Sequence, residues 1–167
     1  MNIHSSEKVQ QPIANSQQPE LKYCYKYPHP AVTADCVIFG FDESNIMKVL
    51  LIQRGNDPYK GKWAFPGGFM EIDETAEQCA RRELEEETGL KDVAVEQFYT
   101  FTDVNRDPRE RIISVAHYAL VKLSEVKGGD DADDAQWFSL DEIPPLAFDH
   151  EEILNKALQT LKERKKL

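Results

Sequence analysis

The chain has 167 residues, of which 41% are hydrophobic, and this is enough for one domain with a buried core. Its formal net charge of −10 at pH 7 argues against binding a nucleic-acid polymer, because that interaction needs clustered Lys and Arg. No apolar run approaches the roughly 20 residues that cross a bilayer, and the start of the chain lacks the apolar centre of a signal peptide, so we expect neither a membrane partner nor export.

The N-terminal part of the chain is predicted to contain a leader and two strands. Residues 1–20 are polar and show no periodicity, which predicts a flexible leader before a single domain over residues 21–167. The β-branched and aromatic runs Ala31–Phe41 and Ile46–Arg54 flank the turn-like sequence DESN and predict two paired strands. The Gly- and Pro-rich residues 55–69 lead from these strands towards a helix.

That helix is predicted from about Thr75 to Thr88. Thr75 and Gln78 form the pattern of a capping box at its start. Gly89 is a typical C-cap and stops the helix.

The remaining elements are three strands and a last helix. The strands are predicted at Ala94–Thr102, at Arg111–Leu123 and, after the acidic loop GGDDADD, at Ala135–Ser139. The last helix, about residues 149–166, has apolar residues at helical spacing, which indicates packing and not recognition. Strands mixed with two helices favour an α/β sheet sandwiched by helices.

The segment Gly68–Leu90 is densely acidic. Charge runs of this kind are usually solvated helix faces. At 100° per residue, however, Glu83, Glu86 and Glu87 share the arc that carries the apolar residues of the helix, so they are expected to face the body of the protein. Like charges so close together repel one another unless they share a cation or one of them holds a proton. A metal site is the simplest explanation, and oxygen ligands favour Mg²⁺ first and Mn²⁺ second.

Two neighbouring features fit such a cation site. Arg82 lies four residues before Glu86 and can pair with it and orient it, although an ordinary surface ion pair is the alternative. The sequence Pro66-Gly67-Gly68 places flexible backbone before the helix, where a main-chain carbonyl can turn towards the same ion.

These residues match a known motif. Gly68, five residues, Glu74, seven residues and then RELEEETGL from Arg82 to Leu90 resemble a complete Nudix box. The resemblance implies an α/β/α sandwich with a mixed β-sheet, and it extends from about Pro30 to Pro144, with the leader and the last helix outside it.

The resemblance also implies roles for the acidic residues. Glu83 and Glu87 are implied as the main metal ligands, Glu86 as a ligand or the base that acts on water, and the Gly67 carbonyl as a further ligand. Arg82 joins these acids as part of the catalytic group, whereas Glu74 is implied to support the motif. Bound Mg²⁺, or Mn²⁺ in its place, would lower the pKa of a water that attacks a diphosphate.

Some members of the family recruit an extra acid from a loop beyond this motif. Here the matching region is the acidic loop, and Asp130, Asp131 and Asp134 are the candidates. A solvated acidic turn is an equally good explanation for each of them.

The substrate suggested by the resemblance is ADP-ribose. The stretches PHPAVTADCVIF and FTDVNRDPRERIISVAHYALV resemble the subgroup described as ADP-ribose pyrophosphatases, which implies cleavage to AMP and ribose 5-phosphate. Arginines that could contact phosphate, although such residues are more often solvated, are Arg54, Arg106, Arg109 and Arg111. Aromatic residues that could stack on a base are Trp63, Phe69, Tyr99 and Phe101, with Trp63 assigned to the core.

Other assignments remain open. The same helix would serve an enzyme that removes oxidised or non-standard nucleoside triphosphates, or a catalytically silent sensor of ADP-ribose-like ligands. A structural protein is disfavoured by the acids that are expected to face inward.

The cysteines and histidines add little to the assignment. Three cysteines without close spacing (Cys24, Cys36 and Cys79) fit a reducing cytoplasm. The four histidines are assigned no catalysis, with His117 expected in the core, and a homodimer is suggested only by analogy.

Overall fold

The computed structural model describes residues 25–129 and 132–166. The predicted leader, Cys24, Asp130 and Asp131 therefore lie outside the described residues. Within the described ranges, no helix is long and apolar enough to cross a membrane.

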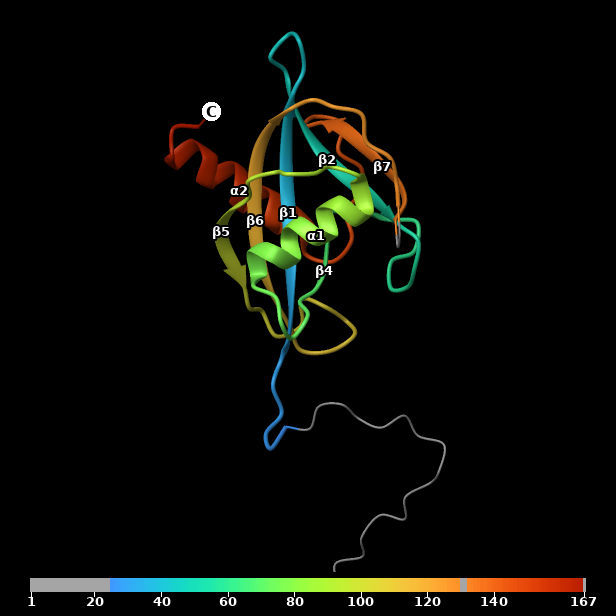
Figure 1. Cartoon of the computed structure of the whole chain (residues 1–167), viewed down its shortest axis with the longest axis vertical. Helices are drawn as coiled ribbons and strands as arrows, with labels where there is room; N and C mark the ends of the chain where they lie inside the picture. Colours follow the sequence, from blue (N-terminus) through green and yellow to red (C-terminus); the bar gives the residue numbers. More distant parts are fainter. Residues whose placement is uncertain (1–24, 130–131, 167) are drawn as a thin grey trace, which may run out of the picture.

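A mixed sheet forms the centre of the molecule (Figure 1). Its strands are β1 (Ala31–Phe41), β2 (Met47–Arg54), β3 (Trp63–Ala64), β4 (Gly67–Phe69), β5 (Glu96–Phe101), β6 (Ile112–Lys122) and β7 (Ala132–Ser139). The main path runs β3-β2-β1-β6-β5, while β4 pairs with β1 and β7 pairs with β2. The central pair, β1 and β6, is parallel over its whole length, from Ala31 opposite Ile112 to Phe41 opposite Lys122.

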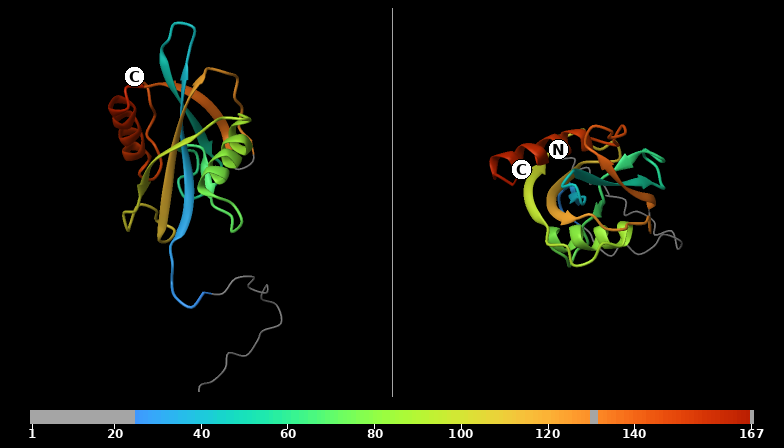
Figure 2. Two further views of the ribbon diagram at one scale, coloured as in Figure 1. Left: turned by 60° about the vertical axis from the view of Figure 1, so that its left-hand side comes forward. Right: turned by 90° about the horizontal axis from the view of Figure 1, so that it is seen from above.

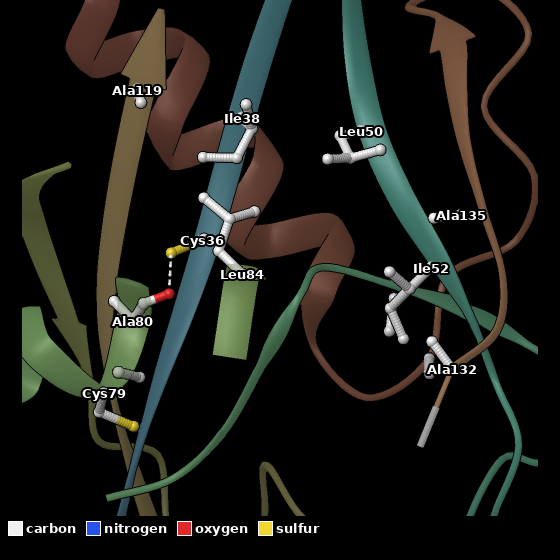
Figure 3. Close-up of a cluster of buried hydrophobic side chains, with 13 residues drawn as sticks. Cys36, Ile38, Leu50, Ile52, Cys79, Ala80, Leu84, Ala119, Ala132 and Ala135 are labelled. Carbon is white, nitrogen blue, oxygen red and sulfur yellow. Dashed lines mark hydrogen bonds between the residues drawn. The ribbon is translucent and has the colours of Figure 1, made fainter. Parts of the chain in front are cut away.

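Two helices cover opposite faces of this sheet, α1 (Ala76–Thr88) and α2 (His150–Glu163) (Figure 2). Alternate residues of β1 explain the two layers, because successive strand side chains point to opposite faces. Cys36 and Ile38 pack in a cluster with Leu84 of α1 (Figure 3). Val37 and Phe39 pack in a second cluster with the apolar residues of α2. The predicted α/β/α sandwich with a mixed sheet is confirmed.

The ends of α1 follow the predicted capping pattern. The Thr75 side chain accepts a hydrogen bond from Gln78 N at 3.3 Å, and the Gln78 side chain accepts one from Thr75 N at 2.8 Å. Gly89 adopts φ 77°, a left-handed conformation that favours glycine. These contacts fix where α1 begins and ends, whereas the packing of Cys79, Ala80 and Leu84 sets which side of the helix faces the sheet.

The structure differs from the sequence prediction in two regions. Residues 55–69 contain the short strands β3 and β4, whose backbone is ordered by pairing with β2 and β1 and not by local propensity. Strand β7 begins at Ala132 and not at Ala135, so Asp134 belongs to a strand paired with Gln53 of β2.

The packing role predicted for the last helix is confirmed for its apolar face. Ile153, Leu154, Ala157 and Leu161 are buried in the cluster on the α2 side of the sheet. The first residue of the helix, His150, is also buried, but it faces a pocket that contains the predicted acidic site.

Candidate active site

A pocket of about 490 Å³ lies where β1, β4, α1 and the start of α2 meet. Glu83 and Glu87 of α1 form part of its wall, together with the Gly67-Gly68 backbone of β4. The structure thus brings together residues that are distant from one another in the sequence, and the predicted metal ligands are among them.

Glu87 is the most buried acid of the group, with 6% of its surface exposed. Its carboxylate accepts a hydrogen bond from the Gly67 N–H at 2.9 Å. Burial raises the pKa of Glu87 to about 8, and the negative charges of Glu83 and Asp35 act in the same direction. A negative charge at this position is therefore costly unless a cation neutralises it.

Glu83 is half-buried beside Glu87, and burial raises its pKa as well. A Cβ atom at the adjacent Gly68 would overlap the Glu83 carboxylate, so a larger residue there would displace this carboxylate. Two partly desolvated carboxylates and a nearby main-chain carbonyl suit a hard divalent cation such as Mg²⁺. In the arrangement described for residues 25–129 and 132–166, however, no three Asp, Glu, His or Cys side chains converge as a metal-binding group.

Arg82 explains why the acids do not converge. Its Nη1 donates to Glu83 Oε1 at 2.7 Å and to Glu86 Oε2 at 3.0 Å. Its Nε and Nη2 hold both oxygens of Glu74, at 3.1 and 2.6 Å, and this pairing lowers the pKa of Glu74 to about 2. Nη2 also donates to the Phe69 carbonyl at 3.2 Å, so a single guanidinium links β4 to three carboxylates of the motif.

The expectation that all three helix acids face inward is wrong for Glu86. Its side chain is 41% exposed, against 16% for Glu83. At 100° per residue Glu86 lies at the edge of the apolar arc, and its partner is Arg82. Its predicted role as ligand or base stays a prediction.

The predicted substrate-binding residues divide into two groups. Arg54, Phe69 and Arg109 all line the pocket, and the Arg109 guanidinium lies 4.9 Å from the centre of the Phe69 ring. Asp134 lies on β7, where its carboxylate accepts from Ala135 N at 2.8 Å, and it is not among the described residues that line the pocket.

All four arginines considered for phosphate contacts also bond to the protein. Arg54 donates to the Pro58 carbonyl at 2.8 Å, and Arg109 forms a bidentate ion pair with Asp107, at 3.0 and 2.7 Å. Arg106 lines the pocket wall, but its guanidinium forms a bidentate ion pair with Asp149, at 2.7 and 2.6 Å. Arg111 donates to the main-chain carbonyls of Thr102 and Asp103. Both therefore have a structural role in shaping the loop after β5.

Three aromatic residues do not face the pocket. Trp63 packs edge-to-face on Phe138 at 4.7 Å in the α2-side cluster, as predicted. Tyr99 and Phe101 contact each other on β5, at 4.9 Å between ring centres, away from the described pocket lining.

The pocket residues that sequence reasoning missed include Asp35, Phe148 and His150. Phe148 places its ring against Arg54, at 4.8 Å, and Arg109, at 5.3 Å. Asp35 is a buried acid inside an otherwise apolar strand, and this isolated charge was the available signal. His150 opens a helix that was assigned to packing alone. His117, in contrast, is a buried core residue whose Nδ1 lies 3.0 Å from the Val115 carbonyl, as predicted.

The raised pKa of Glu87 predicts a pH-dependent stability of the metal-free protein. Because the folded pKa of about 8 exceeds the value of 4.5 for a free carboxyl, this group stabilises the folded state fully below about pH 4.5, and the stabilisation is lost as pH rises through 8. We therefore expect the melting temperature of the metal-free protein to fall between pH 7 and 9, and Mg²⁺ to raise it more at pH 9 than at pH 7. Scanning fluorimetry with chelator and with Mg²⁺ measures both, and the variant Glu87→Gln should remove most of the dependence. An equal Mg²⁺ shift at the two pH values would contradict this assignment.

Comparison with known proteins agrees with the geometry of this site. The family model described as NUDIX domain matches residues 29–159, which includes most of α2 and extends beyond the limit of Pro144 expected from the sequence. A relative from Methanocaldococcus jannaschii named ADP-ribose pyrophosphatase is 44% identical over 135 residues, which cover 81% of this chain and 77% of that protein.

Regulators also occur among the similar proteins. The ADPR responsive transcriptional repressor NtrR of Acinetobacter baylyi is 34% identical over 83% of this chain, but the match spans only 57% of that protein. The solved NUDIX domain of Shewanella oneidensis NrtR, complexed with ADP ribose, has a TM-score of 0.74 and 32% identity, over 84% of this chain and 94% of that domain. The motif on α1, the sandwich that carries it and these similarities lead to one assignment: the chain belongs to the Nudix family and is a Nudix hydrolase.

Proposed function

We propose that the protein is a Mg²⁺-dependent pyrophosphohydrolase that cleaves ADP-ribose to AMP and ribose 5-phosphate. The observation that carries this proposal is the pair of partly buried carboxylates, Glu83 and Glu87, beside the Gly67 backbone in a pocket that also contains Arg54 and Arg109. Carboxylates and arginines that line one pocket suit a metal-bound diphosphate, because the metal would contact the acids while the arginines would contact the phosphate oxygens.

The relatives support the choice of substrate. The name of the M. jannaschii relative refers to ADP-ribose, and the S. oneidensis domain was solved with ADP ribose bound. Among the alternatives, the catalytically silent sensor is supported by the similarity to a repressor. The acidic residues expected of a hydrolase, however, are all present on α1. We therefore favour the enzyme.

The reaction needs little from the protein except positioning and charge. Bound Mg²⁺ would supply Lewis acidity at phosphorus and a lowered pKa for the attacking water. Glu83 and Glu87, with the Gly67 carbonyl, would hold the ion, and Glu86 would act as a ligand or take the proton of the water. Water oxygen bonds to one phosphorus, the bridging P–O bond breaks, and its electron pair leaves with the other phosphate.

Arg82 orients the acids in this scheme. Its contacts to Glu74 and to the Phe69 carbonyl fix the guanidinium, so that it presents Glu83 and Glu86 in set positions. Arg54 and Arg109 would contact the diphosphate, and the Phe69 ring would pack against the substrate. Asp131 and Asp134 stay predictions, as do a homodimer and the separation of the leader from a domain over residues 21–167.

A substrate panel tests the proposal. Phosphate release, coupled to a phosphatase, would be measured with Mg²⁺ over ADP-ribose, NADH, ADP-sugars, diadenosine polyphosphates, CTP and 8-oxo-dGTP. We expect ADP-ribose to lead by at least about tenfold in kcat/KM. A triphosphate in first place would support the second activity, and no turnover of any compound would support the sensor. Mn²⁺ should substitute for Mg²⁺, whereas activity that survives a chelator would contradict the metal-dependent chemistry.

A further inference from the structure

Two polar residues that the reaction scheme does not use lie side by side in the pocket. His150 begins α2 and Asp35 lies in β1, and their exposed fractions are 4% and 6%. Both line the pocket that contains Glu83 and Glu87. Burial of two polar side chains is costly unless their hydrogen-bonding groups find partners, so their arrangement requires an explanation.

The position of the proton on His150 follows from one contact. The Phe65 N–H lies 2.9 Å from Nδ1 of His150. A main-chain amide can only donate, so Nδ1 must accept and the ring proton must be on Nε2. The Phe65 ring stacks on the imidazole, with 5.2 Å between ring centres and 10° between planes, which holds this orientation. His150 therefore presents an N–H donor on its Nε2 side.

That donor faces an acceptor that it does not reach. Nε2 of His150 lies 3.9 Å from Oδ1 of Asp35, which is too long for a hydrogen bond. The other oxygen of Asp35, Oδ2, accepts from the Ser114 hydroxyl. Within the described part of the chain, neither Nε2 nor Oδ1 has a hydrogen-bond partner. The pocket thus offers an N–H donor and a carboxylate acceptor next to each other, both unoccupied by protein.

Only a group that accepts and donates at once satisfies both atoms. A hydroxyl does this, since its oxygen accepts from Nε2–H while its proton goes to Oδ1. A phosphate oxygen could accept from Nε2–H, but the Asp35 carboxylate would repel it. We propose that His150 and Asp35 form a hydroxyl-binding subsite that receives a sugar hydroxyl of the substrate and excludes an additional phosphate.

This inference rests on the proposed function and makes it more specific. The subsite and the acidic residues of α1 line the same pocket, so a diphosphate held at Glu83 and Glu87 would place one of its attached groups near His150. A sugar fits this position, whereas the extra phosphate of a nucleoside triphosphate does not. The pair would therefore favour sugar-bearing diphosphates over triphosphates.

Two variants test the roles of the two ring nitrogen atoms of His150 separately. His150→Asn places an oxygen near the position of Nδ1, which keeps the acceptor for Phe65 N and removes the Nε2 donor. His150→Gln places an amide nitrogen near the position of Nε2, which keeps the donor and removes the acceptor. The substrates are ADP-ribose and the methyl ester of ADP, which retains the diphosphate linkage but has no second sugar. The quantity measured is the ratio of their kcat/KM values, together with the melting temperature of each variant.

We expect His150→Asn to lower the ratio of ADP-ribose to methyl-ADP by roughly tenfold, with kcat/KM for methyl-ADP and the melting temperature close to wild type. His150→Gln should keep the ratio within about threefold of wild type but melt at a lower temperature. Equal losses on both substrates in His150→Asn would mean that the group bound there is water or that the residue is structural, and an unchanged ratio would mean that the substrate does not contact it. Either result overturns the subsite.

The proposed function and the subsite can fail separately. If the wild-type protein hydrolyses neither compound, the proposed function fails, and calorimetric titration of ADP-ribose and methyl-ADP into wild type and His150→Asn decides about the subsite. A wild-type preference for ADP-ribose that His150→Asn abolishes supports the subsite in a binding protein. Equal affinity of the wild type for the two compounds, or no binding of either, overturns it.

Discussion

Replacing Glu87 with Gln is expected to lower kcat for ADP-ribose by on the order of a thousandfold or more while the protein remains folded. The amide keeps an oxygen that can accept the Gly67 N–H, so the contact between α1 and β4 persists. The negative charge that would bind the metal is lost. Since this buried charge is unfavourable without a cation, the metal-free variant should be at least as stable as wild type above pH 8, where wild-type Glu87 ionises.

The matched control is Glu85→Gln on the same helix. Glu85 is exposed on the solvent side, and its only described ion pair is with Lys91 at 2.8 Å. This substitution also removes one negative charge from α1, so it corrects for the change in overall charge. Steady-state kinetics and Mg²⁺ titrations by scanning fluorimetry should show loss of both turnover and metal stabilisation in Glu87→Gln alone. Full activity of Glu87→Gln would show that the metal is held elsewhere.

Removal of the Arg82 guanidinium is expected to have the second largest effect. In Arg82→Ala, the Glu74 carboxylate loses its two hydrogen bonds from the guanidinium and keeps the one from the Glu71 N–H, while Glu83 and Glu86 lose their shared partner. The freed carboxylates repel one another, so we expect kcat to fall by roughly 10- to 100-fold and the protein to unfold at a lower temperature. Arg82→Lys should recover part of the stability but little of the activity, because an ammonium cannot make the bidentate contact with Glu74.

Arg81→Ala serves as the control for Arg82. Arg81 is 46% exposed in its side chain, and its ion pair among residues 25–129 and 132–166 is a long one of 4.0 Å with Glu77. It should change kcat and stability little. If Arg82→Ala behaved like Arg81→Ala in both measurements, the link between the guanidinium and the acids would have no catalytic consequence.

The parts of the fold that local sequence determines were predictable. The capping residues Thr75 and Gln78, together with Gly89, define α1 through contacts within a few residues, and the apolar runs of β1 and β6 are long enough to be recognised alone. Strands β3 and β4 were not predictable, because two or three residues in a Gly- and Pro-rich stretch become strands only by pairing with β2 and β1.

The candidate site shows the same division. The motif on α1 identified Glu83 and Glu87, since they lie close together in the sequence and repeat at helical spacing. Helical spacing alone could not place Glu86, because the exposure of a residue at the edge of the arc depends on how the helix sits on the sheet. Asp35 alone carried a signal, as an isolated charge in a largely apolar strand, but its pairing with His150 could not be predicted. The two residues are 115 positions apart in the sequence and meet only through the packing of α2 on the sheet.

The order of the elements also has a consequence for synthesis of the protein. The central strand β1 finds its long parallel partner only when β6, residues 112–122, has been made, and α2, which follows the seven strands in the chain, covers the second face of the sheet. A chain growing on a ribosome therefore exposes the apolar side chains of that face until α2 has been made. Because the same helix brings His150 to the pocket, completion of the core and completion of the binding site are one event, and a nascent chain stalled before α2 would have neither.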